Sequence, residues 1–254
     1  MSADHCAGGK TITEGKLTIA TGNPAYYPWV HDDAPESGKG NQAAVAYAVA
    51  DKMGFSKDDV VWVRTSFDEA IQPGEKNFDF NMQQYSITVE REKVVDFSQP
   101  YYSAAAAVLV RKKTVEAGAK AEIASLKGLK WGVAQATTGL PVVNDVIKPD
   151  SDVLVYDDNA NTVAAMKADQ IDAAIFDLPT ALFISAVQMD DGVVLGQFPA
   201  DRSDKPDQFG LLMGEGNALK ACVDDALSAM KSDGSLMAIE AEWLQQATSV
   251  PLVK

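Results

Sequence analysis

The stretch QYSITVEREKVVDFSQPYY, from Gln84 to Tyr102, brings together chemical groups that a surface segment rarely combines. Two hydroxyl side chains, Ser86 and Thr88, precede a single arginine, Arg91. An aromatic pair ends the stretch, and a run of small residues follows it at Ala104 to Ala107. A guanidinium can form two parallel hydrogen bonds to one carboxylate, so this stretch can bind an anion just before a strand of small residues.

The composition describes a globular chain. The protein has 254 residues, of which 46% are hydrophobic, and this fits one large domain or two modest ones. No run approaches the ~20 apolar residues that cross a bilayer. The N-terminus MSADHCAGG lacks the charged start and apolar middle of a signal peptide, so we expect either a cytosolic protein or one whose export signal was removed.

The charge excludes one class of partner. The formal net charge is −14, whereas nucleic acids and anionic lipids are bound mainly through Lys and Arg. We therefore expect no nucleic-acid partner, and we interpret the acidity as a property that keeps the protein in solution.

The two cysteines, Cys6 and Cys222, leave two interpretations open. They are either buried free thiols or a disulfide, and the choice depends on the compartment. A metal site is not expected, because the chain adds only His5 and His31 as further soft ligands.

Hydrophobic periodicity predicts strands that alternate with helices along most of the chain. The expected strands lie at residues 16–20, 60–64, 78–82, 105–110, 129–135, 152–156, 171–176, 192–198 and 209–213. The expected helices lie at residues 42–53, 138–146, 161–167, 179–188, 218–231 and 235–246. This alternation predicts an α/β fold with mainly parallel sheets and helices on both faces.

Catalytic motifs are scarce in this sequence. It contains no GxSxG, GxxxxGK[ST], HExxH or CxxC pattern, and no GxGxxG follows a strand. Both histidines lie outside the expected strands and helices, which disfavours acid-base chemistry based on histidine. The sequence favours binding over catalysis, and we expect no catalytic residues, no metal and no cofactor.

A few polar residues at element ends have an ordinary interpretation and a functional one. Arg91 alone is typical of a solvated surface arginine, Thr137 and Thr138 of a helix N-terminus, and Asp177 of a helix cap. Taken together they supply a guanidinium, hydroxyl and N–H donors, and a carboxylate. Such a set can hold both charges of a free amino acid.

Aromatic residues cluster near two of the expected strands. Tyr26 and Trp29 lie in AYYPWV, and Phe67 follows the second strand. Aromatic side chains near strand ends usually belong to the core or its rim. The alternative is a pocket in which two rings enclose a ligand side chain.

These residues carry a resemblance to a known family. SITVEREKVVDFSQPYY resembles the SITxERxKxxDFSxPYY signature of the family 3 extracellular solute-binding proteins, the amino-acid-binding components of ABC importers with the type II periplasmic-binding-protein fold. The resemblance continues through AYYPW, LKGLKWGVAQATTG, IDAAIFDLPTA and the ending from GNAL to WL.

The resemblance implies two lobes joined by a two-segment hinge. Residues 1–104 and 200–254 would form lobe 1, and residues 105–199 would form lobe 2. The crossing segments would lie near residues 102–106 and 196–200. Small residues in a crossing strand are compatible with the backbone changes of hinge closure.

The resemblance also implies roles for individual residues. Arg91 and Ser86 would meet the α-carboxylate of the ligand, with Thr137 and Thr138 as further donors. The backbone carbonyl near Gln84 and the carboxylate of Asp177 would meet the α-amine. Tyr26 and Phe67 would enclose the ligand side chain, with Trp29 completing an apolar slot.

Finally, the resemblance implies a compartment, a partner and a ligand class. Members are exported, so the disulfide between Cys6 and Cys222 becomes the favoured interpretation. We expect a monomeric extracytoplasmic protein that delivers an amino acid to the permease of an ABC transporter.

We expect the ligand to have a neutral side chain, because Gly22, Asn23 and Gln42 stand where relatives that take cationic ligands place acids. The alternatives are a quaternary ammonium ligand held by aromatic rings, a dehydratase on the same fold, and a sensor domain.

Overall fold

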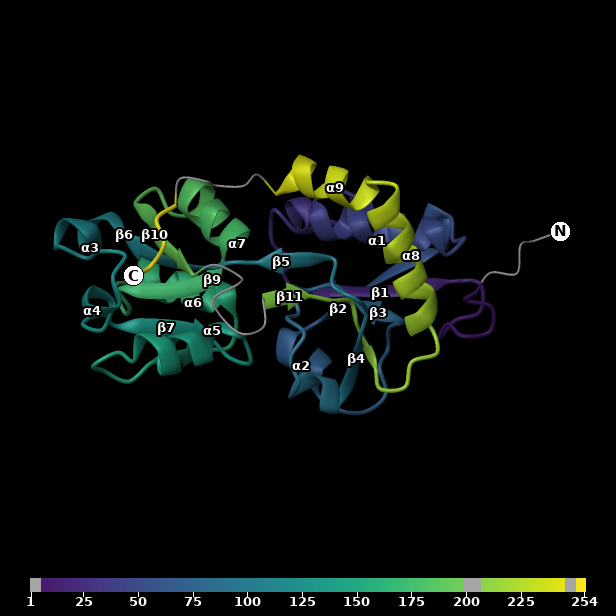
Figure 1. The fold of residues 1–254 in the computed structure, drawn as a ribbon, viewed down its shortest axis with the longest axis horizontal. Helices are drawn as coiled ribbons and strands as arrows, with labels where there is room; N and C mark the ends of the chain where they lie inside the picture. The colour runs from purple at the N-terminus through teal and green to yellow at the C-terminus, as the bar shows by residue number, and fades with distance from the viewer. Residues whose placement is uncertain (1–5, 199–206, 245–249) are drawn as a thin grey trace. The chain divides into compact units, whose positions relative to one another are not determined.

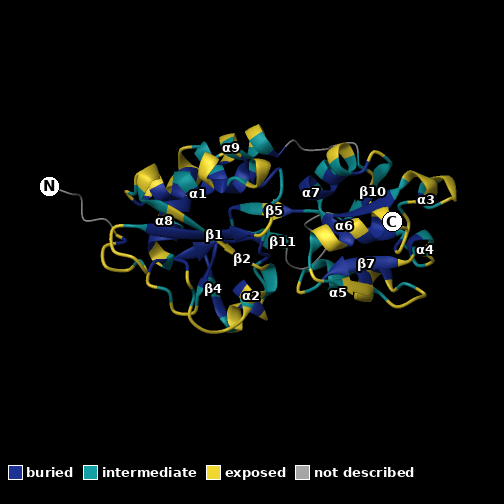
Figure 2. Ribbon diagram, turned by 180° about the vertical axis from the view of Figure 1, so that it is seen from behind, coloured by how far each residue is buried: buried dark blue, intermediate teal, exposed yellow. Residues whose placement is uncertain are grey.

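The computed structural model describes residues 6–198, 207–244 and 250–254, and the chain divides into two compact units (Figure 1). Unit 1 comprises Met1–Ser103 and Gln208–Gln245, and unit 2 comprises Ala104–Asp207 and Gln246–Lys254. Each unit has its own sheet and its own buried core, as Figure 2 shows.

The sheet of unit 1, within the described residues, has five strands in the order β2-β1-β3-β12-β4. β1 runs parallel to β2 and β3, whereas β12 runs antiparallel to β3 and β4. These strands are β1 (Leu17–Gly22), β2 (Val60–Thr65), β3 (Phe80–Asn81), β4 (Val95–Phe97) and β12 (Leu212–Gly214).

The helices of unit 1 include three that pack against one another, α1, α8 and α9. Figure 1 shows α1 and α9 above β1 and α2 below it, while α8 runs downward past the level of β1. The α-helices are α1 (Asn41–Lys52), α2 (Phe67–Ile71), α8 (Lys220–Ser232) and α9 (Ser235–Trp243). Short 3-10 turns lie at η1 (His31–Asp33), η2 (Pro35–Ser37), η3 (Lys57–Asp59) and η4 (Arg91–Lys93).

The described sheet of unit 2 also has five strands, in the order β10-β6-β9-β7-β8. β7 runs parallel to β8 and β9, whereas β6 runs antiparallel to β9 and β10. These strands are β6 (Ala106–Arg111), β7 (Trp131–Ala134), β8 (Leu154–Tyr156), β9 (Ala173–Asp177) and β10 (Gly192–Phe198).

The helices of unit 2 include two whose second half has wider π-type turns. They are α3 (Lys112–Glu116), α4 (Ile123–Leu126), α5 (Gly139–Pro141) continued by η5 (Val142–Ile147), α6 (Asn159–Lys167), and α7 (Leu178–Phe183) continued by η6 (Ile184–Gln188). The expected α/β class with two sheets is therefore confirmed. In detail both sheets are mixed rather than mainly parallel, because β12 in unit 1 and β6 in unit 2 run antiparallel to their neighbours.

The two crossing segments pair with each other as β5 (Tyr102–Ala104) and β11 (Asp207–Phe209). On the first crossing the division between the units falls between Ser103 and Ala104. The second was expected near residues 196–200, but the division places it between Asp207 and Gln208, because the pairing of β10 with β6 keeps residues up to Phe198 in unit 2. Residues 199 and 200 lie outside the described residues.

The end of the chain belongs to unit 2, which corrects the expectation that residues 200–254 lie wholly in lobe 1. Val253 is buried in the core of unit 2, and its backbone N donates to the carbonyl of Gln197 at 2.9 Å. Gly196 allows this approach, because a Cβ there would lie 2.9 Å from the Val253 side chain. The burial of one valine and the strand-like pairing thus decide where the C-terminal segment packs.

A disulfide joins Cys6 to Cys222, with their Cα atoms 5.8 Å apart. It connects the segment before β1 to helix α8, both in unit 1. The interpretation favoured from the family resemblance is confirmed, and that of two free thiols was wrong. The same N-terminal arm is held by the buried carboxylate of Asp79, which accepts from the backbone N of Ile12 at 2.9 Å and of Thr18 at 2.7 Å.

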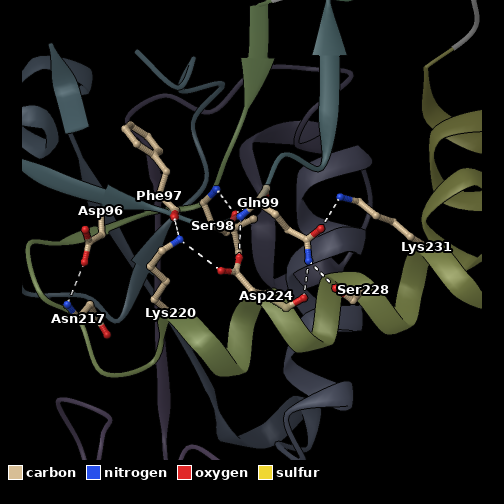
Figure 3. A network of polar contacts seen from close by, with 10 residues as sticks. Asp96, Phe97, Ser98, Gln99, Asn217, Lys220, Asp224, Ser228 and Lys231 are labelled. Carbon is tan, nitrogen blue, oxygen red and sulfur yellow. Dashed lines mark hydrogen bonds and ion pairs between the residues drawn. The ribbon is translucent and has the colours of Figure 1, made fainter. Parts of the chain in front are cut away.

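The segment that leads into β5 is docked on α8 by a network of polar contacts (Figure 3). The backbone N of Gln99 donates to Asp224 at 2.6 Å, and its side-chain amide donates to Ser228 at 2.7 Å. The ammonium of Lys231 donates to the amide oxygen of Gln99 at 2.7 Å, although burial lowers the pKa of this lysine. The chain therefore enters the first crossing from a fixed position on unit 1.

Candidate binding residues in each unit

The residues expected to bind a carboxylate lie in unit 1, after the end of β3. Gln84 has a φ of +54°, a left-handed conformation that is uncommon for a residue other than glycine. The next residues pair with β11, through a bridge between Ser86 and Phe209 and through the backbone N of Ile87, which donates to the carbonyl of Gln208 at 2.8 Å. Backbone hydrogen bonds therefore fix Ser86, which is buried.

Arg91 is buried, with 8% of its surface exposed, in contrast to the solvated arginine of the ordinary interpretation. Its Nη1 donates to the backbone carbonyl of Ser86 at 2.7 Å, and its backbone N donates to the hydroxyl of Thr88 at 3.2 Å. Its guanidinium carbon lies 5.5 Å from the centre of the Phe67 ring, within the range of a cation–π contact. The structure thus brings together the serine, the arginine and one of the predicted aromatic residues.

Phe67 stands at the start of α2 and stacks on Tyr85, with ring centres 4.6 Å apart and an angle of 24° between the planes. The hydroxyl of Tyr85 lies 3.2 Å from the Phe67 carbonyl and 3.0 Å from the side-chain oxygen of Gln83. Burial raises the pKa of Tyr85, and the positive charge of Arg91 acts in the opposite direction. The Phe67 ring therefore contacts both the Arg91 guanidinium and the Tyr85 ring.

The other predicted aromatic residues have different environments. Trp29 has no exposed surface, and its ring meets those of Tyr102 and Phe209 edge-on at 5.4 and 5.7 Å. Trp29 therefore packs in the core, which is the ordinary interpretation of an aromatic residue near a strand end. Tyr26 is half-buried, and its carbonyl accepts from the backbone N of Val30 at 2.7 Å. Tyr26 and Phe67 are thus the partly exposed aromatic residues of the predicted set.

Gln42 is one of the positions at which the family resemblance leads us to look for an acid. It is buried at the first turn of α1. Its amide contacts the hydroxyl of Tyr101 and the side-chain amide of Gln84. Sequence reasoning did not single out Tyr85, Tyr101 or Gln83 as supports of the binding residues. A signal for two of them existed, because Tyr85 and Tyr101 lie inside the stretch quoted at the outset.

The predicted residues of unit 2 gather at one edge of its sheet. β7 and β9 are parallel neighbours, with Trp131 opposite Ala173 and Gly132 opposite Ala174. Thr137 and Thr138 follow β7, and Asp177 ends β9. The carboxyl ends of adjacent parallel strands share an edge, which is where open α/β sheets bind ligands. The structure therefore brings this carboxylate and these hydroxyl groups to the same edge.

Each of these three polar side chains has a structural partner. The hydroxyl of Thr137 donates to the carbonyl of Ala134 at 2.8 Å, and that of Thr138 donates to Asp207 at 3.3 Å. Asp177 caps α7, since it accepts from the backbone N and the hydroxyl of Thr180 at 2.9 and 2.8 Å. The cap interpretation of Asp177 is confirmed, and a capping carboxylate keeps lone pairs for a second donor.

The described residues show neither a metal-binding cluster nor a helix that could span a membrane. No group of three or more His, Cys, Asp or Glu side chains among residues 6–198, 207–244 and 250–254 is arranged to hold a metal ion. No helix in this part of the chain is both long and apolar enough to cross a membrane.

Comparison with curated proteins finds relatives that are named for amino acids. The chain is 27% identical to ABC transporter arginine-binding protein 1 of Escherichia coli K12 over 176 residues, which is 67% of this chain and 68% of that protein. It is 30% identical to the L-cystine-binding protein TcyJ of the same organism over 169 residues, 66% of this chain and 60% of that protein. The matches thus span about two thirds of the length of these relatives.

Comparison with solved structures covers more of the chain. An ancestral arginine-binding protein bound to arginine matches with a TM-score of 0.73 and 27% identity, over 91% of this chain and 99% of that one. The ancestral amino acid-binding protein AncCDT-1, described as a precursor of cyclohexadienyl dehydratase, matches with a TM-score of 0.71 and 27% identity, over 91% and 96%. The fold is therefore that of the type II periplasmic binding proteins.

The model of one family covers most of the sequence. The description of that family is bacterial extracellular solute-binding proteins, family 3, and the match runs over residues 17–246. It includes the SITVER stretch, both crossing segments and the residues of β7 and β9. This chain belongs to family 3 of the bacterial extracellular solute-binding proteins, a family of binding proteins rather than enzymes.

Proposed function

We propose that this protein binds a free amino acid outside the cytoplasm and delivers it to an ABC importer. The observation that carries the proposal is the guanidinium of Arg91, which is fixed between the Ser86 carbonyl and the Phe67 ring. A buried, preorganised guanidinium is suited to a planar carboxylate, because its donors match both carboxylate oxygens. Arg91 and Ser86 would hold the α-carboxylate, and Tyr26 and Phe67 would contact the side chain.

The α-ammonium would be met by Asp177 and by the backbone carbonyl near Gln84. Asp177 is suited to this role because Thr180 fixes both of its oxygens at distances of 2.9 and 2.8 Å. A preorganised carboxylate loses little freedom when it binds a cation. Thr137 and Thr138 would add donors at the same sheet edge. Trp29 would support the site from the core of unit 1 without touching the ligand.

The relatives support the amino-acid class and the transporter partner. One is named an ABC transporter arginine-binding protein and another an L-cystine-binding protein. The names do not support the neutral side chain expected from the sequence, since arginine recurs in them. The neutral ligand therefore rests on the sequence argument alone, namely that Gly22, Asn23 and Gln42 are not acids.

A thermal-shift screen with the free amino acids tests the proposed class. A ligand present at ~100 times its Kd is expected to stabilise the protein by roughly 2.7 kcal/mol. Calorimetry with glutamine, phenylalanine, arginine and glycine betaine then identifies the side chain. Tight binding of arginine would contradict the neutral side chain, and binding of betaine alone would contradict the proposed roles of Arg91 and Asp177.

The similarity to a dehydratase precursor defines a second arm of that screen. Prephenate and arogenate are incubated with the protein, and product formation is followed. We expect none, because Asp177 is engaged as a helix cap and as the proposed ammonium partner. Turnover of either compound would overturn the binding-protein assignment.

Replacing Asp177 by asparagine separates its two roles. Asparagine is as good an N-cap as aspartate, so we expect Asp177→Asn to unfold within about 0.5 kcal/mol of the wild type. Its affinity should nevertheless fall by roughly 2 kcal/mol or more, because the ammonium loses its counter-charge. Asp177→Ala should lose the same affinity and about 1 kcal/mol of stability as well.

Urea unfolding and calorimetry of the two variants check this prediction. Normal affinity in Asp177→Asn, together with lower stability in Asp177→Ala, would leave Asp177 as a cap alone.

A further inference from the structure

The loop that carries Tyr26 is connected at both of its ends to one side chain from a neighbouring strand. The loop leaves β1 at Gly22 and ends in the turn η1 at Asp33. Arg64 lies on β2, which runs beside β1. Its Nη1 donates to the carbonyl of Gly22 at 2.8 Å, and its Nη2 donates to the carbonyl of Asp33 at 2.6 Å.

The same guanidinium also forms an ion pair with the carboxylate of Asp33. That carboxylate in turn accepts from the backbone N of Ala25 at 2.8 Å, directly before Tyr26. One arginine and one aspartate therefore connect the start, the middle and the end of the loop. We call this set of contacts, made by Arg64 and Asp33, the loop clamp.

The backbone of the loop needs such support. Asp32 and Asp33 both have a φ of +52°, a conformation that L-residues adopt at a cost. At Gly22 a Cβ would lie 2.8 Å from the carbonyl of Pro24, so the loop turns back on itself at once. A tight turn at one end and a strained pair at the other persist only where the surroundings hold them.

The clamp orders the backbone of the loop more than it stabilises the fold as a whole. The side chains of Arg64 and Asp33 are 32% and 46% exposed, and ion pairs this exposed add little to the stability of the fold. The bonds to the Gly22 and Asp33 carbonyls instead restrict the loop backbone. A lysine could not reproduce them, because its ammonium lacks the planar fork of a guanidinium.

We propose that Arg64 and Asp33 are positioning residues that fix the loop so that Tyr26 is ready for the ligand. The proposal rests on the proposed function, in which Tyr26 contacts the ligand side chain. Under this proposal neither Arg64 nor Asp33 contacts the ligand itself. The clamp raises affinity because a loop that is already ordered loses less conformational freedom when the ligand binds.

Hydrogen exchange tests the clamp without any ligand. In Arg64→Ala the amides of Ala25 and Tyr26 are expected to exchange about tenfold faster or more, since the contacts of Arg64 with Gly22 and Asp33 are gone and Asp33 is no longer held in place. The matched control is Arg111→Ala in unit 2, which removes an arginine paired with Asp169 and Asp191. The control should leave the exchange of Ala25 and Tyr26 unchanged. Unchanged exchange in Arg64→Ala overturns the proposal.

Calorimetry with L-glutamine and L-arginine tests the consequence for binding. For whichever the wild type binds, we expect Arg64→Ala to weaken affinity about five- to twentyfold, Asp33→Asn to weaken it less, and Arg111→Ala to leave it unchanged. Arg64→Lys should recover only part of the loss. In a Tyr26→Ala background the Arg64→Ala change should add almost nothing, because Arg64 acts through Tyr26.

The outcomes separate this proposal from the proposed function. Full additivity of the Arg64 and Tyr26 variants would overturn the positioning role, since a merely structural residue would weaken binding in either background. A wild-type protein that binds no amino acid would overturn the proposed function, while the exchange measurement would still decide whether the clamp holds the loop.

Discussion

Arg91→Ala is expected to abolish measurable amino-acid binding while the protein still folds. Removing one partner of a buried, hydrogen-bonded charge pair costs about 2 to 5 kcal/mol, or roughly 30- to 5,000-fold in Kd. The α-carboxylate would lose its fork of donors, and the Phe67 ring would lose the cation 5.5 Å from its centre. Calorimetry with the amino acid that most stabilises the wild type measures the loss.

Arg91→Lys is the informative companion variant. It keeps the positive charge but removes the two parallel hydrogen bonds, so its affinity should lie between those of the wild type and Arg91→Ala. Urea unfolding of both variants shows whether the fold survives the loss of the bond to the Ser86 carbonyl. Near-normal affinity in Arg91→Ala would mean that the carboxylate is bound elsewhere.

Removal of the disulfide is expected to produce the largest change in stability. Cys6 and Cys222 are 216 residues apart in sequence. Closing a loop of this length stabilises the native state by about 5 kcal/mol in the chain-entropy description. The double variant Cys6→Ser with Cys222→Ser should therefore unfold at a clearly lower urea concentration, because its unfolded chain is less restricted.

Reductant supplies the matched control for this prediction. Dithiothreitol should lower the stability of the wild type toward that of the double serine variant and should have no effect on that variant. Mass spectrometry of the unreduced wild type should show no free thiol at these two positions. Two free thiols, or equal stability of the wild type and the variant, would contradict the prediction.

The longer elements were predictable because their own side chains carry the signal. The expected helix at residues 42–53 is α1 at Asn41–Lys52, and the expected strand at residues 192–198 is β10 at the same residues. Short elements carry no such periodicity. The three-residue strand β4 exists because Leu212, Met213 and Gly214 pair with it, and the strand expected at residues 209–213 is divided between β11 and β12.

The binding residues show the same division between local and distant causes. Asp177 was predictable as a cap, because the preference of aspartate before Pro179 and Thr180 is local. The partners of Trp29 in the core were not, because Tyr102 and Phe209 are distant from it in the sequence. The clamp of Arg64 on Asp33 likewise depends on β2 lying beside β1.

The sequence by itself determined the family, the α/β class, the longer elements and the identity of the groups that can hold two opposite charges. These properties follow from composition, periodicity and a local motif. Tertiary structure alone decided that both sheets are mixed, that Val253 joins the core of unit 2, and that Arg91 is buried against Phe67. Such features depend on apolar burial and backbone pairing between residues far apart in the chain, which local periodicity does not encode.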